Sequence, residues 1–270
     1  MDKTTHIDKV WRTYFTNHNE GIGTTYERFI LHQHFERIKN KFSINSVLEV
    51  PSFGMTGISG INSLWWENNK IPVTLVDHDK ERLDLIRSVW EELSFKANFV
   101  YQEEGYLKFA FENNAFDLSW NFASLRMAQD LKQFLGELAR VSKKVIFICI
   151  PNCSNIFNLL RRVGGIDPLK IKETMRNFNW QIAEEGFMDT PPWPDIAMKK
   201  EDLLQKFGLG RRRGREVERR ICILDYFSGK NIDMEKEVLR YAFLENTPSF
   251  FQSLWAHHRY FIFTPERKII

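Results

Sequence analysis

The sequence contains little cysteine and no long apolar run. Its 270 residues include three cysteines, Cys149, Cys153 and Cys222, which are too few for a disulfide framework and fit a reducing compartment. The longest apolar run, VIFICI from Val145 to Ile150, is far shorter than the roughly 20 residues that a membrane span needs. The first residues, MDKTTHIDKVWRTYF, lack the apolar centre of a signal peptide. We therefore expect a cytoplasmic protein with no membrane span.

Several ligand-binding motifs are missing as well. Cys149 and Cys153 have no partner CxxC or HxxxH, so we expect no metal site. The chain has neither the G-x-G-x-x-G of dinucleotide dehydrogenases nor the G-K-[ST] of phosphate-binding loops. The net charge is only +3, but the window from Lys199 to Arg220 holds nine basic and four acidic side chains, so this window carries +5 and the rest of the chain −2.

The first part of the chain alternates between strand and helix patterns. A helix is expected from Thr24 to Lys41, and further helices over about 60–69, 79–93 and 127–141, because apolar residues recur there at helical spacing. Five short β-type runs lie between them: Ser46–Val50, Pro72–Asp77, Ala97–Gln102, Phe116–Asn121 and Lys144–Pro151. This alternation predicts an α/β fold with a doubly wound, mostly parallel sheet.

The alternation of strand and helix patterns ends after Pro151. Residues 153–207 read as two or three helices with no clear strand, which predicts a helical insertion that caps the substrate. Strands are expected again at Glu216–Phe227 and Ala256–Pro265, with a short helix near Met234–Phe243. Two late strands would complete seven. We therefore predict an N-terminal helical lid over residues 1–45 and a core formed by 46–152 and 208–270.

Polar residues at the strand ends carry the functional signal. The first strand ends in Glu49, and the following PSFGMTGISG contains Gly54, Gly57 and Gly60, which allow positive φ or close approach of a ligand to the backbone. The second strand ends in Asp77, about twenty residues further on, where a carboxylate suits the two hydroxyls of a ribose. Together the turn and the acid indicate a cofactor of the adenosine type.

Four segments together resemble class I S-adenosylmethionine-dependent methyltransferases of the small-molecule, generic methyltransferase-domain type: SVLEVPSFGMTGISGINSL, PVTLVDHDKERL, NFVYQEEGYLKFAFENNAFDLSWNFASL and FLGELARVSKKVIFICIPN. The resemblance covers about residues 24–152 and rests on order and spacing. It implies a seven-stranded Rossmann-like methyltransferase fold, S-adenosylmethionine as the cofactor and a methyl acceptor as the partner. The cofactor-binding residues that it implicates are Glu49, Pro51, Gly54, Gly57, Asp77, His78, Gln102, Glu103 and Asn121.

The loop departs from the family pattern E-x-G-x-G-x-G. Pro51 stands at the first glycine, and about two additional residues precede GMTG. Proline fixes φ and has no N–H to donate, so the loop must take another path. After the third strand, where the family has an acid with a glycine, this chain has QEEG.

The methyl acceptor should be a small molecule that is aligned with the sulfonium methyl group and shielded from water. The family pattern places Trp120 and Phe122 near the acceptor, and Trp193 of the PPWP segment is a third candidate, although such aromatic residues also suit the core. If the acceptor needs a general base, the candidates are His257, His258 and Tyr26.

Two alternatives remain open from the sequence. The basic window from Lys199 to Arg220 would suit RNA or another nucleic acid, although no N-P-P-Y-type motif follows the fourth strand. The other alternative is a methyltransferase-fold binding protein without activity, which Pro51 favours. The sequence determines neither the acceptor nor the oligomeric state.

Overall fold

The computed structural model describes residues 6–54, 57–103, 105–156, 165–191 and 221–266. These form one seven-stranded sheet with the strand order β3-β2-β1-β4-β5-β7-β6. The strands are β1 (Val47–Glu49), β2 (Val73–Asp77), β3 (Asn98–Tyr101), β4 (Phe116–Phe122), β5 (Ser142–Pro151), β6 (Trp180–Met188) and β7 (His258–Pro265). The pairings from β3 through β5 are parallel, and β7 pairs antiparallel to both β5 and β6. The predicted fold class is confirmed.

The first five strands lie where the sequence predicts them, but the C-terminal half needs two corrections. The segment 153–207, expected to be helical, contains β6, which pairs with β7 over most of its length. A strand is expected at Glu216–Phe227. For the described residues of this range the prediction is wrong, because Ile223–Phe227 forms helix α9. Apolar side chains at 221–224 matched either structure, and packing onto the neighbouring helices selected the helix.

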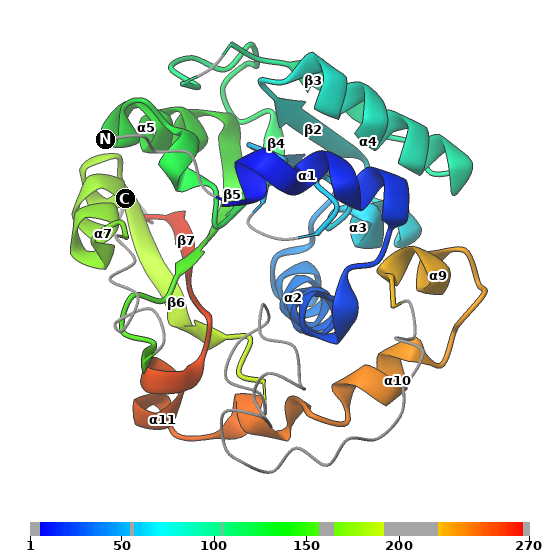
Figure 1. The fold of residues 1–270 in the computed structure, drawn as a ribbon. Helices are drawn as coiled ribbons and strands as arrows, with labels where there is room; N and C mark the ends of the chain where they lie inside the picture. Colours follow the sequence, from blue (N-terminus) through cyan, green and yellow to red (C-terminus); the bar gives the residue numbers. More distant parts are fainter. Residues whose placement is uncertain (1–5, 55–56, 104, 157–164, 192–220, 267–270) are drawn as a thin grey trace.

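Helices cover both faces of the sheet (Figure 1). One apolar cluster joins α2, α3 and α4 to one face, and a second joins α5 and α7 to the other. The helices in the described part of the chain are α1 (His6–Asn17), α2 (Gly21–Phe42), α3 (Leu64–Asn68), α4 (Lys80–Glu92), α5 (Leu131–Val141), α7 (Pro168–Asn177), α9 (Ile223–Phe227), α10 (Met234–Leu239) and α11 (Ser249–Trp255), with short 3₁₀ helices η1 (Leu125–Met127) and η2 (Ala242–Asn246). None of these helices is long and apolar enough to cross a membrane.

Alternation along the strands explains the two clusters. Val47 on β1 joins the cluster under α2, whereas its neighbour Leu48 joins the cluster under α5, since successive strand residues point to opposite faces.

Asp79 and Asp130 fix the starts of α4 and α5, because each carboxylate accepts a hydrogen bond from a backbone N–H in the first turn. The positions of β1, β2 and β4 relative to the helices follow from these local signals.

One glycine after β1 is required by both its backbone and its surroundings. Gly60 has φ +68°, and a Cβ at this position would lie 2.7 Å from the Cδ1 atom of buried Ile86. We expect Gly60→Ala to lower the free energy of unfolding by about 2–4 kcal/mol, because the left-handed conformation costs about 1–2 kcal/mol and overpacking adds a similar amount. Chemical denaturation measures the change.

Gly229→Ala is the matched control, because Gly229 also has a positive φ, +75°, but nothing lies within 4 Å of its Cβ position. This variant should lose only the backbone part, about 1 kcal/mol. Equal losses in the two variants would contradict the packing argument.

Candidate cofactor site

The parallel strands bring the predicted cofactor residues to one edge of the sheet. Glu49 and Asp77 end the adjacent strands β1 and β2, and Asn121 lies near the end of β4, on the other side of β1. The carboxyl ends of parallel strands share an edge, and ligands of open α/β sheets bind at that edge. The structure therefore assembles in space a set of residues that the sequence spreads over more than seventy positions.

The carboxylate of Asp77 is fully buried, and hydrogen bonds from the chain occupy all of its acceptor positions. Its Oδ1 accepts hydrogen bonds from Arg82 Nη2 at 2.5 Å and from the Asp79 N–H at 2.9 Å. Its Oδ2 accepts from Arg82 Nε at 3.0 Å and from Ser52 Oγ at 2.7 Å. Two carboxylate oxygens offer about four acceptor positions, and all four are taken within the chain.

Arg82 is the main partner of Asp77, and it is absent from the residues that the sequence motifs implicate. Its guanidinium packs 3.9 Å from the ring centre of Phe53 and 5.1 Å from that of Trp11. Its Nη1 also lies 3.6 Å from the Oδ2 of Asp79, which is partly exposed. The spacing of the two residues could have indicated this pair, because Arg82 lies five residues after Asp77, in the first turn of α4.

Glu49 occupies a different electrostatic environment. It is buried and accepts a hydrogen bond from Ser63 Oγ at 2.6 Å, while the Nε1 of Trp120 donates to the same Oγ at 3.2 Å. Burial raises the pKa of Glu49 to about 8. At neutral pH this carboxyl group is therefore mostly protonated, unlike an exposed glutamate.

The glycine loop is packed against the start of α2. A Cβ on Gly57, where φ is +69°, would lie 2.2 Å from Glu20 Oε1 and 2.8 Å from Arg28 Nη2. The buried Glu20 and Arg28 form an ion pair, Arg28 donates to the carbonyl of Ile58 at 2.9 Å, and the Ile58 N–H donates to Glu20 Oε1 at 2.7 Å. A carboxylate of this chain thus lies against a backbone N–H of the loop. No local sequence pattern indicates this ion pair, because its residues are eight positions apart and meet the loop only in the folded chain.

Asn121 and Phe122 close the edge at β4. Asn121 Nδ2 donates to the carbonyl of Val50 at 2.9 Å and to Ser124 Oγ at 2.7 Å, which ties β4 to the residue before Pro51. The Oδ1 of Asn121 is buried and has no hydrogen-bond partner among the described residues. Phe122 borders Gly54, since a Cβ there would lie 3.9 Å from its ring.

The remaining predicted residues have mixed environments. His78 is half-buried, and both its backbone N–H and its Nδ1 hydrogen-bond the hydroxyl of Tyr106, at 3.1 and 2.7 Å. Gln102 is half-buried and Glu103 exposed, both directly after β3. Trp120 lies in the core, 4.8 Å from the ring centre of Phe35. Trp193 and the basic window 199–220 lie outside the described residues.

The three candidate bases lie beside carboxylates, and one of them, His258, borders Phe122. The Phe122 ring lies 4.8 Å from that of His258. His257 Nδ1 lies 2.7 Å from Asp189 Oδ2, and the hydroxyl of Tyr26 donates to Glu245 Oε1 at 2.8 Å. Burial raises the pKa of Tyr26 and lowers that of His258. The structure therefore brings the three together, and each has a carboxylate nearby.

The arrangement supports nucleotide-type binding only in part. The strand ends, the glycine turn and the acids have the order that the family uses, and Asn121 Oδ1 offers a buried acceptor. However, Asp77 cannot accept ribose hydroxyls while Arg82, Ser52 and the Asp79 N–H occupy its four acceptor positions. In this conformation the ribose end does not fit S-adenosylmethionine.

A seven-stranded sheet in this order, with its last pairings antiparallel and polar residues gathered at the carboxyl edge, defines the class I methyltransferase fold. The sequence profile of the methyltransferase domain family matches residues 54–149. This match and the fold confirm the resemblance to class I S-adenosylmethionine-dependent methyltransferases. No curated protein matches the sequence significantly.

Solved structures show the same fold at low sequence identity. A Galdieria sulphuraria protein provisionally described as a sarcosine dimethylglycine methyltransferase is 12% identical, with a TM-score of 0.53 and 86% of this chain and 84% of that chain covered. The [4+2]-cyclase SpnF is 14% identical, with a TM-score of 0.52 and coverage of 87% and 80%. An S-adenosylmethionine-dependent methyltransferase from Clostridium acetobutylicum is 9% identical, with a TM-score of 0.50 and coverage of 89% and 92%.

The raised pKa of Glu49 makes stability depend on pH. The folded chain holds a proton on Glu49 up to about pH 8, whereas the unfolded chain releases it near 4.5. The contribution of Glu49 to stability is therefore fully present below pH 4.5 and is lost as the pH rises through 8, with a slope of up to about 1.4 kcal/mol per pH unit. Glu49→Gln, which mimics the protonated form, should remove this slope.

Urea denaturation of wild type and variant between pH 5 and 8.5 measures the effect, and the stability of Glu49→Gln relative to wild type should rise with pH. Glu36→Gln, at an exposed position on α2, is the control and should run parallel to wild type. A wild-type slope that survives in Glu49→Gln would show that Glu49 is not its source.

Proposed function

We propose that this chain is an S-adenosylmethionine-dependent methyltransferase that transfers a methyl group to a small-molecule acceptor. The observation that carries the proposal is the placement of Glu49, the glycine turn and Asp77 at adjacent strand ends of a class I methyltransferase sheet. The match of residues 54–149 to the methyltransferase domain family supports the same activity.

Cofactor binding on this proposal requires Arg82 and Ser52 to release Asp77. Arg82 has a second carboxylate in reach, because its Nη1 already lies 3.6 Å from Asp79 Oδ2. Moving the guanidinium towards Asp79 would keep its charge paired and free the Asp77 oxygens for the two ribose hydroxyls. Arg82 would then act as an internal competitor that weakens cofactor affinity.

The acceptor side is assigned to the surroundings of His258, whose ring borders that of Phe122, together with the candidate bases His257 and Tyr26. An imidazole whose Nδ1 hydrogen-bonds a carboxylate, such as His257 beside Asp189, could accept a proton through Nε2 from an acceptor hydroxyl or amine. The small-molecule class is favoured because these groups are buried or half-buried, which suits a compact acceptor more than a polymer. RNA or another nucleic acid is the alternative acceptor and rests only on the basic window 199–220.

A second candidate function follows from the saturated carboxylate of Asp77. If Arg82 does not move, the chain keeps the methyltransferase fold as a binding protein or as an enzyme of another kind, without this cofactor. The [4+2]-cyclase SpnF shares the fold, and fold alone does not determine chemistry. The two candidates therefore differ in whether Asp77 binds the cofactor.

Calorimetry with S-adenosylmethionine and S-adenosylhomocysteine distinguishes the candidates. The methyltransferase proposal expects binding by wild type, a loss of at least about tenfold in affinity for Asp77→Asn, and tighter binding by Arg82→Met, since the competitor is removed. Asp117→Asn is the matched control: Asp117 is also a buried acid, paired with Lys144, but it lies at the start of β4, on the opposite edge of the sheet.

Each result decides between the candidates. Absence of binding at millimolar concentration by both wild type and Arg82→Met would favour the cofactor-free protein. Equal losses in Asp77→Asn and Asp117→Asn would show that general destabilisation, and not a ribose contact, causes the effect. For the acceptor, an affinity for RNA that falls steeply with salt would favour the nucleic-acid alternative.

A further inference from the structure

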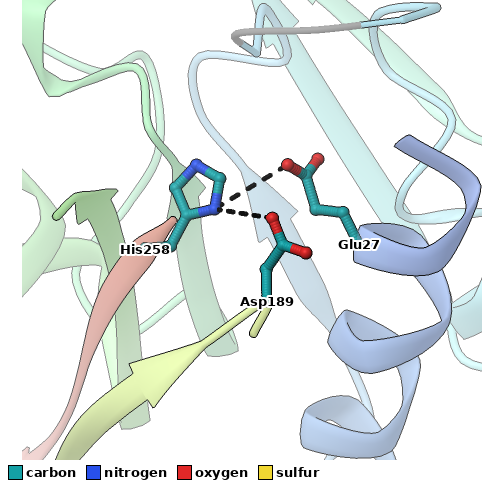
Figure 2. A group of neighbouring side chains, drawn as sticks. All are labelled: Glu27, Asp189 and His258. Carbon is teal, nitrogen blue, oxygen red and sulfur yellow. Dashed lines mark ion pairs between the residues drawn. The ribbon is translucent and has the colours of Figure 1, made fainter. Parts of the chain in front are cut away.

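Three ionisable side chains from distant parts of the sequence meet inside the protein. Glu27 comes from α2, Asp189 follows the last residue of β6, and His258 is the first residue of β7. All three are buried, with 3%, 0% and 4% of their surfaces exposed. Figure 2 shows both carboxylates turned towards the imidazole. We call these three residues the buried triad.

The separations within the buried triad are those of groups around a common centre. His258 Nδ1 lies 3.7 Å from Glu27 Oε2 and 3.7 Å from Asp189 Oδ2. One donor atom from each residue lies within 4.8 Å of the others. Three atoms so arranged surround a point at most about 2.4 Å from each, which is close to the bond lengths of about 2.0–2.2 Å that zinc forms with oxygen and nitrogen.

Two polar atoms of the buried triad, one on His258 and one on Asp189, are not satisfied by the described part of the chain. His258 Nδ1 and Asp189 Oδ1 are buried and have no hydrogen-bond partner there, and 3.7 Å is too long for a hydrogen bond. Each such group costs free energy unless a partner meets it. A cation between the two carboxylates and the imidazole would provide a partner for His258 Nδ1, the unpartnered atom that faces both carboxylates.

A neighbouring residue orients one of the ligands. His257 Nδ1 lies 2.7 Å from Asp189 Oδ2, and the backbone N–H of His257 donates to the carbonyl of Asp189 at 2.9 Å. Hydrogen bonds of this kind hold metal ligands in a fixed orientation in known sites. Asp189 is therefore held from two directions while its side chain faces Glu27 and His258.

We propose that the buried triad binds one divalent transition-metal ion, Zn²⁺ or Mn²⁺, through Glu27, Asp189 and His258. Two carboxylate oxygens and one imidazole nitrogen form a donor set suited to these ions, and three protein ligands leave further coordination positions. The ion would join α2, the end of β6 and the start of β7. The site does not depend on cofactor binding, because it uses none of the residues around Asp77.

The test uses the full chain after removal of metal with a chelator. Calorimetry with Zn²⁺ and electron paramagnetic resonance with Mn²⁺ should each give one ion per chain, and the ion should raise the melting temperature. Glu27→Gln, Asp189→Asn and His258→Gln should each lower the affinity at least about tenfold. His34→Gln replaces another buried histidine, on α2 and outside the buried triad, and should bind as wild type does.

X-ray absorption of the zinc-loaded wild type provides a measurement that needs no variant. It should show oxygen and imidazole ligands and no sulfur. No binding of either metal at millimolar concentration, sulfur in the coordination shell, or unchanged affinity in folded variants of the buried triad would each overturn the proposal.

Discussion

Carboxylates buried at the carboxyl edge of the sheet determine most of what is unusual in this protein. A buried charge has to be paired, hydrogen-bonded or neutralised, because desolvation costs several kcal/mol or more. Asp77 is paired with Arg82, and Glu20 is paired with Arg28. Glu49 forms no ion pair with the described residues, and burial raises its pKa more than the nearby charge of Arg28 lowers it. These three responses to one constraint fix the conformation of the region where the family binds its cofactor.

The same constraint links the conformation of the edge to function. Because the loop after β1 is packed on Glu20 and Arg28, and Asp77 is held by Arg82, a ligand entering this region has to replace interactions that the chain already makes. Its net affinity is the difference between the new contacts and the ones lost. Phe53 and Trp11 lie against Arg82 and would have to adjust with it. The edge is therefore preorganised around its own side chains.

The C-terminal half contributes a second group of acids. Since β7 runs antiparallel to its neighbours, its first residues lie at the same edge as the last residues of β4 and β5. Asp189 and Glu245 join this edge, and burial raises the pKa of Glu245 to about 7, although it accepts hydrogen bonds from Tyr26 and Thr190. This half therefore has several carboxylates close together, and the metal ion proposed for the buried triad would balance part of their charge.

The sequence by itself determined the α/β alternation, the first five strands, the helix start at Asp79, and the placement of Glu49 and Asp77 at strand ends, because these depend on local periodicity and capping. It missed β6 and misread α9, whose apolar residues suit either structure. Only the tertiary structure decided that Arg82 forms an ion pair with Asp77 and that Glu27, Asp189 and His258 lie close together. The physical reason is that contacts between residues far apart in the chain leave no local pattern, and burial, which sets their charge and partners, is a property of the folded chain.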